Sequence, residues 1–267
     1  MVENSINLFI KDYEDLEVLQ NNNLEERLKK FIKENDIIEY DFSYEYTKFD
    51  TEQSILSKLI WKILFSIYYQ DKLSQFLIKE NERFSTCILS NKNNVDANDF
   101  TFDVYYDVMN NNKSIRDEYH RIGNYSVYPR MDKSPQLQNI HKYFNEQWDK
   151  LLFFLQTNWE NKEVIYTTVK GQKVEYKQEK SFQEKWGNLS FKEYMILTCQ
   201  QIYYKEIWEE ISLQPKEIHL ETIEDWNANI RNKEECELLT VEYNNPEMVK
   251  KLISIRGEII KVLLTEK

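Results

Sequence analysis

The stretch 120–130, HRIGNYSVYPR, constrains the fold most, because it holds one of only four glycines and one of only four prolines in 267 residues. Its centre, residues 122–128, is rich in β-branched and aromatic side chains and ends at Pro129, which predicts a strand. Gly123 inside this strand indicates a bulge or the close approach of another backbone. Asn124 can hold a turn or bond backbone groups through its amide. Either the pair forms only a structural bulge, or it belongs to a binding site.

An amphipathic helix is predicted to follow this strand after a long loop. Apolar side chains recur at spacings of three and four, which is typical of one helix face: Phe144, Trp148, Leu151, Leu152, Leu155 and Trp159. Asp149 lies next to this stripe, where a carboxylate needs a partner because its burial is costly. The candidate partners are Arg121, Arg130 and Arg256. The simpler alternative is a helix that only contributes to the core.

The pattern along the chain predicts an α+β fold, mainly helical with a small antiparallel sheet. Residues 38–46 alternate strictly between apolar and polar side chains, which predicts a strand with one solvated face. Two β-rich runs flank Gly171, so residues 164–176 are expected to form a hairpin. The sheet is therefore expected to combine the segments 38–46, 122–128 and 164–176.

Four further helices are predicted from apolar residues at helical spacing, over residues 24–32, 55–67, 190–211 and 245–262. Ser190 with Glu193 is a capping-box signature, and Pro215 lies beyond the end of that helix. Asn245 and Pro246 predict the start of the last helix, as its cap and its first turn. Residues 100–109 fit a strand or a helix equally well, and residues 217–241 are ambiguous.

Length and charge bound the class of protein. A chain of 267 residues can bury a sizeable core as a single domain, 1–267, with a possible subdivision into 1–160 and 161–267. Its formal net charge of -11 repels phosphate backbones, so nucleic acid is not the expected partner. An acidic chain suits a protein-binding surface, or mimicry of the charge of a nucleic acid.

The cysteines and the apolar runs indicate a cytoplasmic protein. Cys87, Cys199 and Cys236 are far apart and odd in number, so neither a disulfide framework nor a zinc site is expected. Reduced thiols are typical of the cytoplasm. We expect no signal peptide and no membrane-spanning segment, because the best apolar run, residues 59–69, is short and contains a lysine.

Motifs for known chemistry are missing from the sequence. His120, His141 and His219 are scattered and show neither HxxxH nor HExxH spacing, so no metal site is predicted. The sequence contains no Walker A motif, no GxGxxG and no GxSxG, and we expect no cofactor.

The order of three motifs resembles a family of uncharacterised bacterial proteins. Those proteins carry an H-x-I-G-N-x-x-x-x-P stretch, a Y/F-W-D-L-x-L helix and a terminal I-x-x-R-G-K-R helix, which correspond here to 120–129, 148–152 and 255–260. The same order is similar, more distantly, to the C-terminal part of the HNH-type (His-Me finger) nuclease domain of GmrSD-like restriction enzymes. In that resemblance Asn124 matches the motif asparagine, and Arg256 matches the terminal arginine.

The resemblance implies a relative that has lost its catalytic motif. In those nucleases a histidine in an upstream D/E-H-I-x-P motif activates water beside a metal ion, and no such motif precedes His120. We therefore predict a non-catalytic protein that binds a protein partner, in phage–host conflict or a mobile element. The alternative is an active metal-dependent nuclease with unrecognised ligands. The candidate binding residues are His120, Arg121, Asn124, Arg130, Asp149 and Arg256.

Arg256 carries the most specific prediction. It lies at the edge of the apolar stripe of the terminal helix, where an arginine either extends to water or holds a carboxylate or exposed carbonyls. We predict that this helix packs against the helix 144–159 and brings Arg256 within hydrogen-bond reach of Asp149 or of the region around Asn124. Gly257 beside it would permit a close approach.

Overall fold

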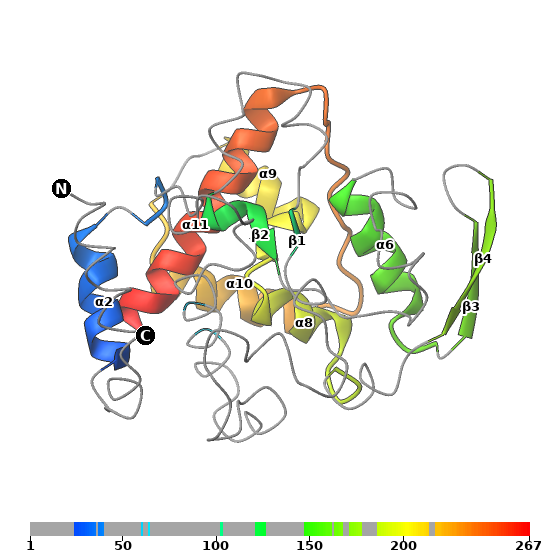
Figure 1. Ribbon diagram of the computed structural model, residues 1–267, viewed down its shortest axis with the longest axis horizontal. Coiled ribbons are helices and arrows are strands. Elements are labelled where there is room, and N and C mark those ends of the chain that lie inside the picture. The colour runs from blue at the N-terminus through cyan, green and yellow to red at the C-terminus, as the bar shows by residue number, and fades with distance from the viewer. Residues whose placement is uncertain are drawn as a thin grey trace, which may run out of the picture.

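The computed structural model describes residues 24–35, 37–39, 60, 64, 102–103, 121–126, 147–161, 163–167, 171–177, 186–213 and 217–267. Within these ranges the protein is mainly helical (Figure 1). The α-helices are α2 (Leu24–Glu34), α6 (Trp148–Asn158), α8 (Phe191–Leu197), α9 (Lys205–Leu213), α10 (Leu220–Asn232) and α11 (Pro246–Glu266). Two 3-10 turns, η8 (Ile122–Asn124) and η9 (Gln201–Tyr203), lie between them.

The terminal helix α11 is the central element of the described core. It begins as predicted, because the Asn245 side chain accepts a hydrogen bond from the backbone N–H of Met248 at 3.2 Å, and Pro246 occupies its first turn. The helix packs against η8 and α2, and also contacts α10 and η9 (Figure 1). Eleven of its 21 residues are buried, and only Glu247, Ser254 and Glu266 are exposed, so the buried face is wider than one narrow stripe.

The helix predicted over residues 190–211 is broken into α8, η9 and α9. It starts at Ser190, whose hydroxyl accepts from the backbone N–H of Glu193, and α9 ends at Leu213, ahead of Pro215, as predicted. The break follows from Cys199, whose φ of 56° is left-handed. The N–H of Cys199 bonds the carbonyl of Ile196, and that of Gln200 bonds the carbonyl of Met195. This is a Schellman helix end, with cysteine at the position that glycine usually occupies.

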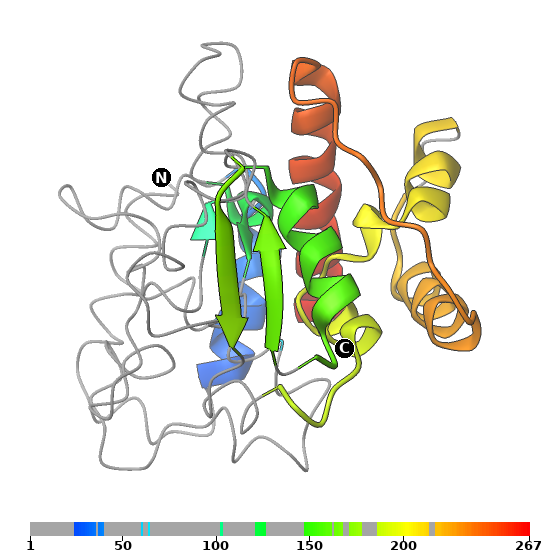
Figure 2. The same ribbon diagram turned by 90° about the vertical axis from the view of Figure 1, so that its right-hand side faces the viewer.

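Helix α10 lies in the segment that the sequence left ambiguous. Its buried side chains, Ile223, Trp226 and Ile230, are spaced three and four apart, and they turn toward the core. The helix packs against α8 and α11. The segment that follows it, residues 233–245, is largely extended, and we call it the strap (the orange coil in Figure 2).

The predicted α+β class is wrong for the described part of the chain, because the small antiparallel sheet is not formed. Ile38 lies in a bend rather than a strand, and its side chain packs beside Gly257 of α11. Residues 122–124 form the 3-10 turn η8, and only Tyr125–Ser126 (β2) pairs, with Phe102–Asp103 (β1). Residues 40–46 and 127–128 lie outside the described ranges. Apolar contact with α11 therefore replaces the sheet.

The predicted hairpin at 164–176 is present, but as an isolated pair. Strand β3 (Glu163–Thr167) runs antiparallel to β4 (Lys173–Lys177), with Ile165 opposite Glu175. Gly171, in the turn, has a φ of 76°. Ile165 is 70% exposed, and the hairpin shares no sheet with β1 and β2. It therefore adds no strands to the helical core.

The structure describes one of the two other predicted helices in full and two residues of the second. The helix 24–32 is confirmed as α2. Of the helix predicted over 55–67, only Ile60 and Leu64 are described, and both are helical and buried. None of the helices in the described ranges combines the length and the apolar character needed to cross a bilayer.

Candidate functional site

Arg256 forms the centre of the site that the sequence pointed to. Its side chain is completely buried, and each guanidinium nitrogen donates to a backbone carbonyl. Nε donates to Cys199 at 3.1 Å, Nη1 to Gly123 at 2.9 Å and Nη2 to Thr198 at 3.0 Å. The prediction that Arg256 reaches the region of Asn124 is therefore confirmed. Its charge also lies at the C-terminal end of α8, where the helix dipole favours a cation.

Glycine is needed at position 123 because another part of the backbone lies very close to it. The conformation of Gly123 does not require glycine, since its φ lies outside the left-handed region. A Cβ built on Gly123 would lie 1.9 Å from the backbone oxygen of Ile253 and 2.9 Å from the backbone nitrogen of Gly257. The close backbone approach expected at this glycine is therefore confirmed, and the approaching backbone is that of α11. Asn124, the next residue of η8, is also completely buried.

A buried polar network connects this cluster to α6. The indole nitrogen of Trp148 donates to Oε1 of Gln200 at 2.8 Å, and Nε2 of Gln200 donates to the Thr198 hydroxyl at 2.7 Å. Nε2 of Gln200 also lies 3.2 Å from the Tyr194 hydroxyl. Burial raises the pKa of Tyr194 well above its ordinary value, and it raises the pKa of the Cys199 thiol to about 12. Both groups are therefore neutral at physiological pH.

Asp149 is buried, as expected for a carboxylate on this helix, but its partners are not arginines. Oδ1 accepts from the Tyr243 hydroxyl at 2.6 Å, and Oδ2 accepts from the backbone N–H of Val241 at 3.1 Å. Both partners belong to the strap. Burial, followed by the charge of Asp149, raises the pKa of Tyr243 well above its ordinary value. Asp149 therefore anchors the strap to α6, and the expected pairing of Asp149 with Arg121, Arg130 or Arg256 is replaced by this anchor.

Of the three remaining candidate residues the structure describes Arg121, which forms an ion pair with Glu39 rather than with Asp149. Arg121 lies 3.4 Å from the Glu39 carboxylate, measured from Nη2 to Oε2. His120 and Arg130 lie outside the described residues. The structure thus unites Arg256 with Gly123 and Asn124, and it separates Asp149 from them.

The geometry of the Arg256 cluster is that of a structural clamp. Each guanidinium nitrogen is used on a backbone carbonyl, and these carbonyls belong to η8 and to the junction between α8 and η9. A planar guanidinium suits this task, because its donors point in fixed directions within one plane. Since Arg256 and Asn124 are fully buried, a ligand reaches neither side chain in this conformation.

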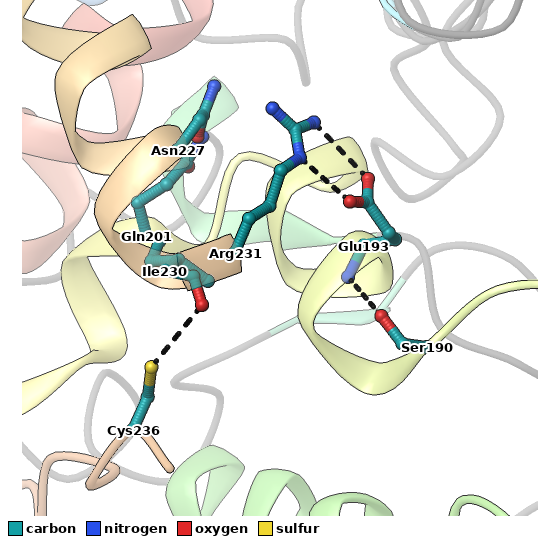
Figure 3. A network of polar contacts seen from close by, with 7 residues as sticks. All are labelled: Ser190, Glu193, Gln201, Asn227, Ile230, Arg231 and Cys236. Carbon is teal, nitrogen blue, oxygen red and sulfur yellow. Dashed lines mark hydrogen bonds and ion pairs between the residues drawn. The ribbon is translucent and has the colours of Figure 1, made fainter. Parts of the chain in front are cut away.

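A second polar network ties α8 to α10 at the surface (Figure 3). The Arg231 guanidinium bonds the Glu193 carboxylate through Nε at 2.8 Å and through Nη2 at 3.3 Å. The backbone N–H of Glu193 in turn donates to Ser190. The predicted capping box thus directs its acidic side chain toward α10. Deeper in the same region, Nε2 of Gln201 donates to Oδ1 of Asn227 at 2.9 Å.

An open cleft of about 510 Å3 lies between α9, the strap and the beginning of α11. Leu238 and Leu239 are buried in its wall, while Trp208 and Met248 are half-exposed. Acidic side chains surround this apolar floor. The lining consists of Lys205, Trp208, Glu209, Glu237, Leu238, Leu239, Thr240, Glu242, Asn245 and Met248.

One carboxylate of the cleft, that of Glu237, forms an ion pair with Lys205, and two others do not form one within the described ranges. The Lys205 ammonium lies 3.0 Å from both carboxylate oxygens of Glu237, and this hydrogen bond and charge raise the pKa of Lys205. Glu209 and Glu242 are exposed and form no ion pair within the described ranges. Two carboxylates are therefore available to a ligand.

The strap is the fixed wall of this cleft. Its backbone pairs with η9 and α9, with Leu239 donating to Tyr203 at 2.8 Å and Lys205 donating to Glu237 at 2.9 Å. On its other side the Gln156 amide donates to the Cys236 carbonyl at 3.0 Å. Figure 2 shows the strap running from α10 toward the start of α11. Sequence reasoning missed this cleft, because its lining comes from three elements with no common motif.

Comparison with known proteins gives no match to a family model, to a curated protein or to a solved structure. In the part of the chain that the structure describes, no group of three or more His, Cys, Asp or Glu side chains is placed to hold a metal ion.

Proposed function

We propose that this protein is a non-catalytic binding protein, and that the cleft beside the strap is the site at which it takes a protein partner. The observation that carries the proposal is the cleft itself, an open volume of about 510 Å3 with an apolar floor and an acidic rim. Its walls are held in place by backbone pairing and by Asp149. A preformed concave surface with a few polar groups is typical of a binding site.

The overall charge supports a protein partner over a nucleic acid. A net charge of -11 opposes a phosphate backbone, and the rim of the cleft carries three carboxylates against one ammonium group. The context of phage–host conflict and the cytoplasmic location are parts of the same proposal. They rest on the order of the sequence motifs and on the cysteine pattern.

The residues matched to the nuclease motif support a structural rather than a chemical role. Arg256 donates to three carbonyls in the core, and Asn124 is buried beside it. A residue that handles a scissile phosphate must reach the substrate, and these two side chains have no access to solvent.

Two assays test the proposal. In the first, purified protein is incubated with plasmid DNA and with RNA in the presence of Mg²⁺ or Mn²⁺, and we expect no hydrolysis. Metal-dependent degradation that persists through repurification and is lost in His120→Ala would make the protein an enzyme and overturn the proposal.

In the second assay, tagged protein captures partners from cells that naturally express it. Thr240→Arg places a bulky cation on an exposed strap residue that lines the cleft, while Asp225→Arg places one on the exposed surface of α10. We expect Thr240→Arg alone to lose the captured protein. Equal capture by both variants would show that the partner binds elsewhere.

A further inference from the structure

We propose that the occupant of the cleft is a basic segment of the partner protein, one that alternates lysine or arginine with apolar side chains. This inference rests on the proposed function and specifies the chemistry of the partner. It is carried by the combination of an apolar floor with two carboxylates that have no ion-pair partner in the described part of the chain.

The floor of the cleft suits the apolar part of such a segment. Trp208 on α9 and Met248 on α11 are half-exposed and present apolar surface to the cleft, with Leu238 and Leu239 of the strap buried in the wall beside them. Lysine and arginine have long methylene stems that pack on apolar surface while their charged ends remain in water. The Lys251 ammonium lies 5.5 Å from the centre of the Trp208 ring, so this ring already makes one cation–π contact within the chain.

The rim selects for positive charge. Glu209 belongs to α9 and Glu242 to the strap, so two different elements of the cleft lining each supply an exposed carboxylate. A second copy of this chain would bring a further charge of -11 and would be repelled on average. A basic segment of another protein is the partner whose charge complements the cleft.

Replacing Lys205 should change the affinity for a basic ligand in the opposite direction to replacing a carboxylate of the rim. Its ammonium group pairs with both oxygens of Glu237, so in the free protein it neutralises one of the three carboxylates of the rim. Lys205→Ala releases that carboxylate and makes the cleft more acidic. A basic ligand should then bind more tightly, whereas an acidic ligand that had used Lys205 would bind more weakly.

The experiment uses the full-length protein and three blocked peptides of equal length. The basic probe is Gly-Lys-Leu-Lys-Leu-Lys-Gly, and in the two matched probes glutamine or glutamate replaces every lysine. Fluorescence anisotropy of labelled peptides gives the Kd at low and at high salt. The ¹⁵N-labelled indole resonances of the six tryptophans report the location, with Trp208→Phe identifying the signal of Trp208.

We expect the basic peptide alone to move the Trp208 resonance. Glu209→Gln and Glu242→Gln should each weaken binding by roughly two- to fivefold, the usual effect of one exposed ion pair, and Lys205→Ala should tighten it by a similar factor. Asp225→Asn removes the same unit of charge from the exposed surface of α10 and should leave Kd within about 1.5-fold, since charges on the surface are screened by salt. Raising the salt concentration should weaken binding.

Two results would overturn this inference. If the neutral or acidic peptide moved the Trp208 resonance as strongly as the basic one, the cleft would bind peptides without selecting positive charge, and the proposed function would stand. If none of the three peptides moved it, the cleft would take no extended basic segment. The proposed function would then depend on the capture assay with Thr240→Arg. Melting curves of every variant exclude loss of folding as the cause.

Discussion

Replacing Gly123 with alanine is the sharpest perturbation of the core, because it adds a single carbon at the closest backbone contact. That carbon would lie 1.9 Å from the oxygen of Ile253, whereas ordinary contacts begin at 3.4 Å. The obstacle is the backbone of α11, which no rotamer change can remove. Helix and turn must therefore separate by about 1.5 Å, the difference between these two distances.

The cost has two parts. Forcing extra volume into a packed core costs about 1–3 kcal/mol. The separation also stretches the bond from Arg256 to the Gly123 carbonyl, now 2.9 Å, beyond hydrogen-bonding range, and a bond to a charged group contributes about 1.5–3 kcal/mol. Replacing glycine lowers the entropy of the unfolded chain and returns only about 0.4–1 kcal/mol. The steric and hydrogen-bond terms exceed the entropy term, and we expect a net loss of stability of about 1.5–5.5 kcal/mol.

Gly257→Ala is the matched control, because it adds the same carbon four residues beyond Ile253. There the nearest atom is a side-chain methyl group of Ile38 at 3.2 Å, which needs to move only slightly. Alanine also improves the helix propensity by about 1 kcal/mol, so the stability should change by no more than about 1 kcal/mol.

Urea unfolding followed by tryptophan fluorescence measures both glycine variants. The midpoint of Gly123→Ala should fall far below that of the wild type, with Gly257→Ala close to it. If the two variants had equal midpoints, η8 would not pack on α11 as described.

Three further predictions concern Arg256 and the two ends of α8. Arg256→Lys should lose about 3 kcal/mol or more in urea unfolding, because one ammonium group cannot replace a guanidinium that donates to three carbonyls; wild-type stability in this variant would refute the clamp. Ser190→Ala should cost about 1 kcal/mol through loss of the α8 cap, and an unchanged thermal midpoint would show that the cap contributes nothing. Burial raises the pKa of Cys199 to about 12, so at pH 8 its thiol should resist alkylation in the folded protein and react in urea; mass spectrometry of the peptide that contains Cys199 checks this, and rapid labelling of the native state would contradict it.

Local sequence signals predicted the helices and their starts well. The stripes of α2, α6 and α11 and the caps Ser190 and Asn245 depend on residues close together in the sequence, so periodicity and capping rules suffice. Helix α10 was not predicted, because the segment 217–241 was left ambiguous, although Ile223, Trp226 and Ile230 have helical spacing.

The features that sequence reasoning missed depend on distant residues. Cys199, in the left-handed conformation, ends α8. The carbonyls of Thr198 and Cys199 at this helix end accept hydrogen bonds from Arg256, which is more than 50 residues away in the sequence. The segment 122–128 has a strand-like composition. Its first three residues nevertheless form the 3-10 turn η8, in which Gly123 packs closely against the backbone of α11. Tertiary contact overrides local propensity in such cases.

The candidate site divides in the same way. The order of motifs in the family resemblance placed Arg256 near the Asn124 region correctly, since Arg256 bonds the Gly123 carbonyl. The partners of Asp149 were not visible, because Tyr243 and the Val241 backbone lie on a strap that has no regular pattern. The cleft depends on the path of that strap and therefore needed the structure.

The most direct test of the account is photo-crosslinking in cells that naturally express the protein. A photoreactive amino acid is placed at Thr240, in the cleft, and separately at Asp225, on the exposed face of α10. We predict a discrete crosslinked protein from position 240, absent from position 225, whose crosslinked peptide is rich in lysine or arginine. Crosslinks that are equal at the two positions, or a crosslink at 240 only to nucleic acid, would contradict the claim that this cleft binds a protein partner.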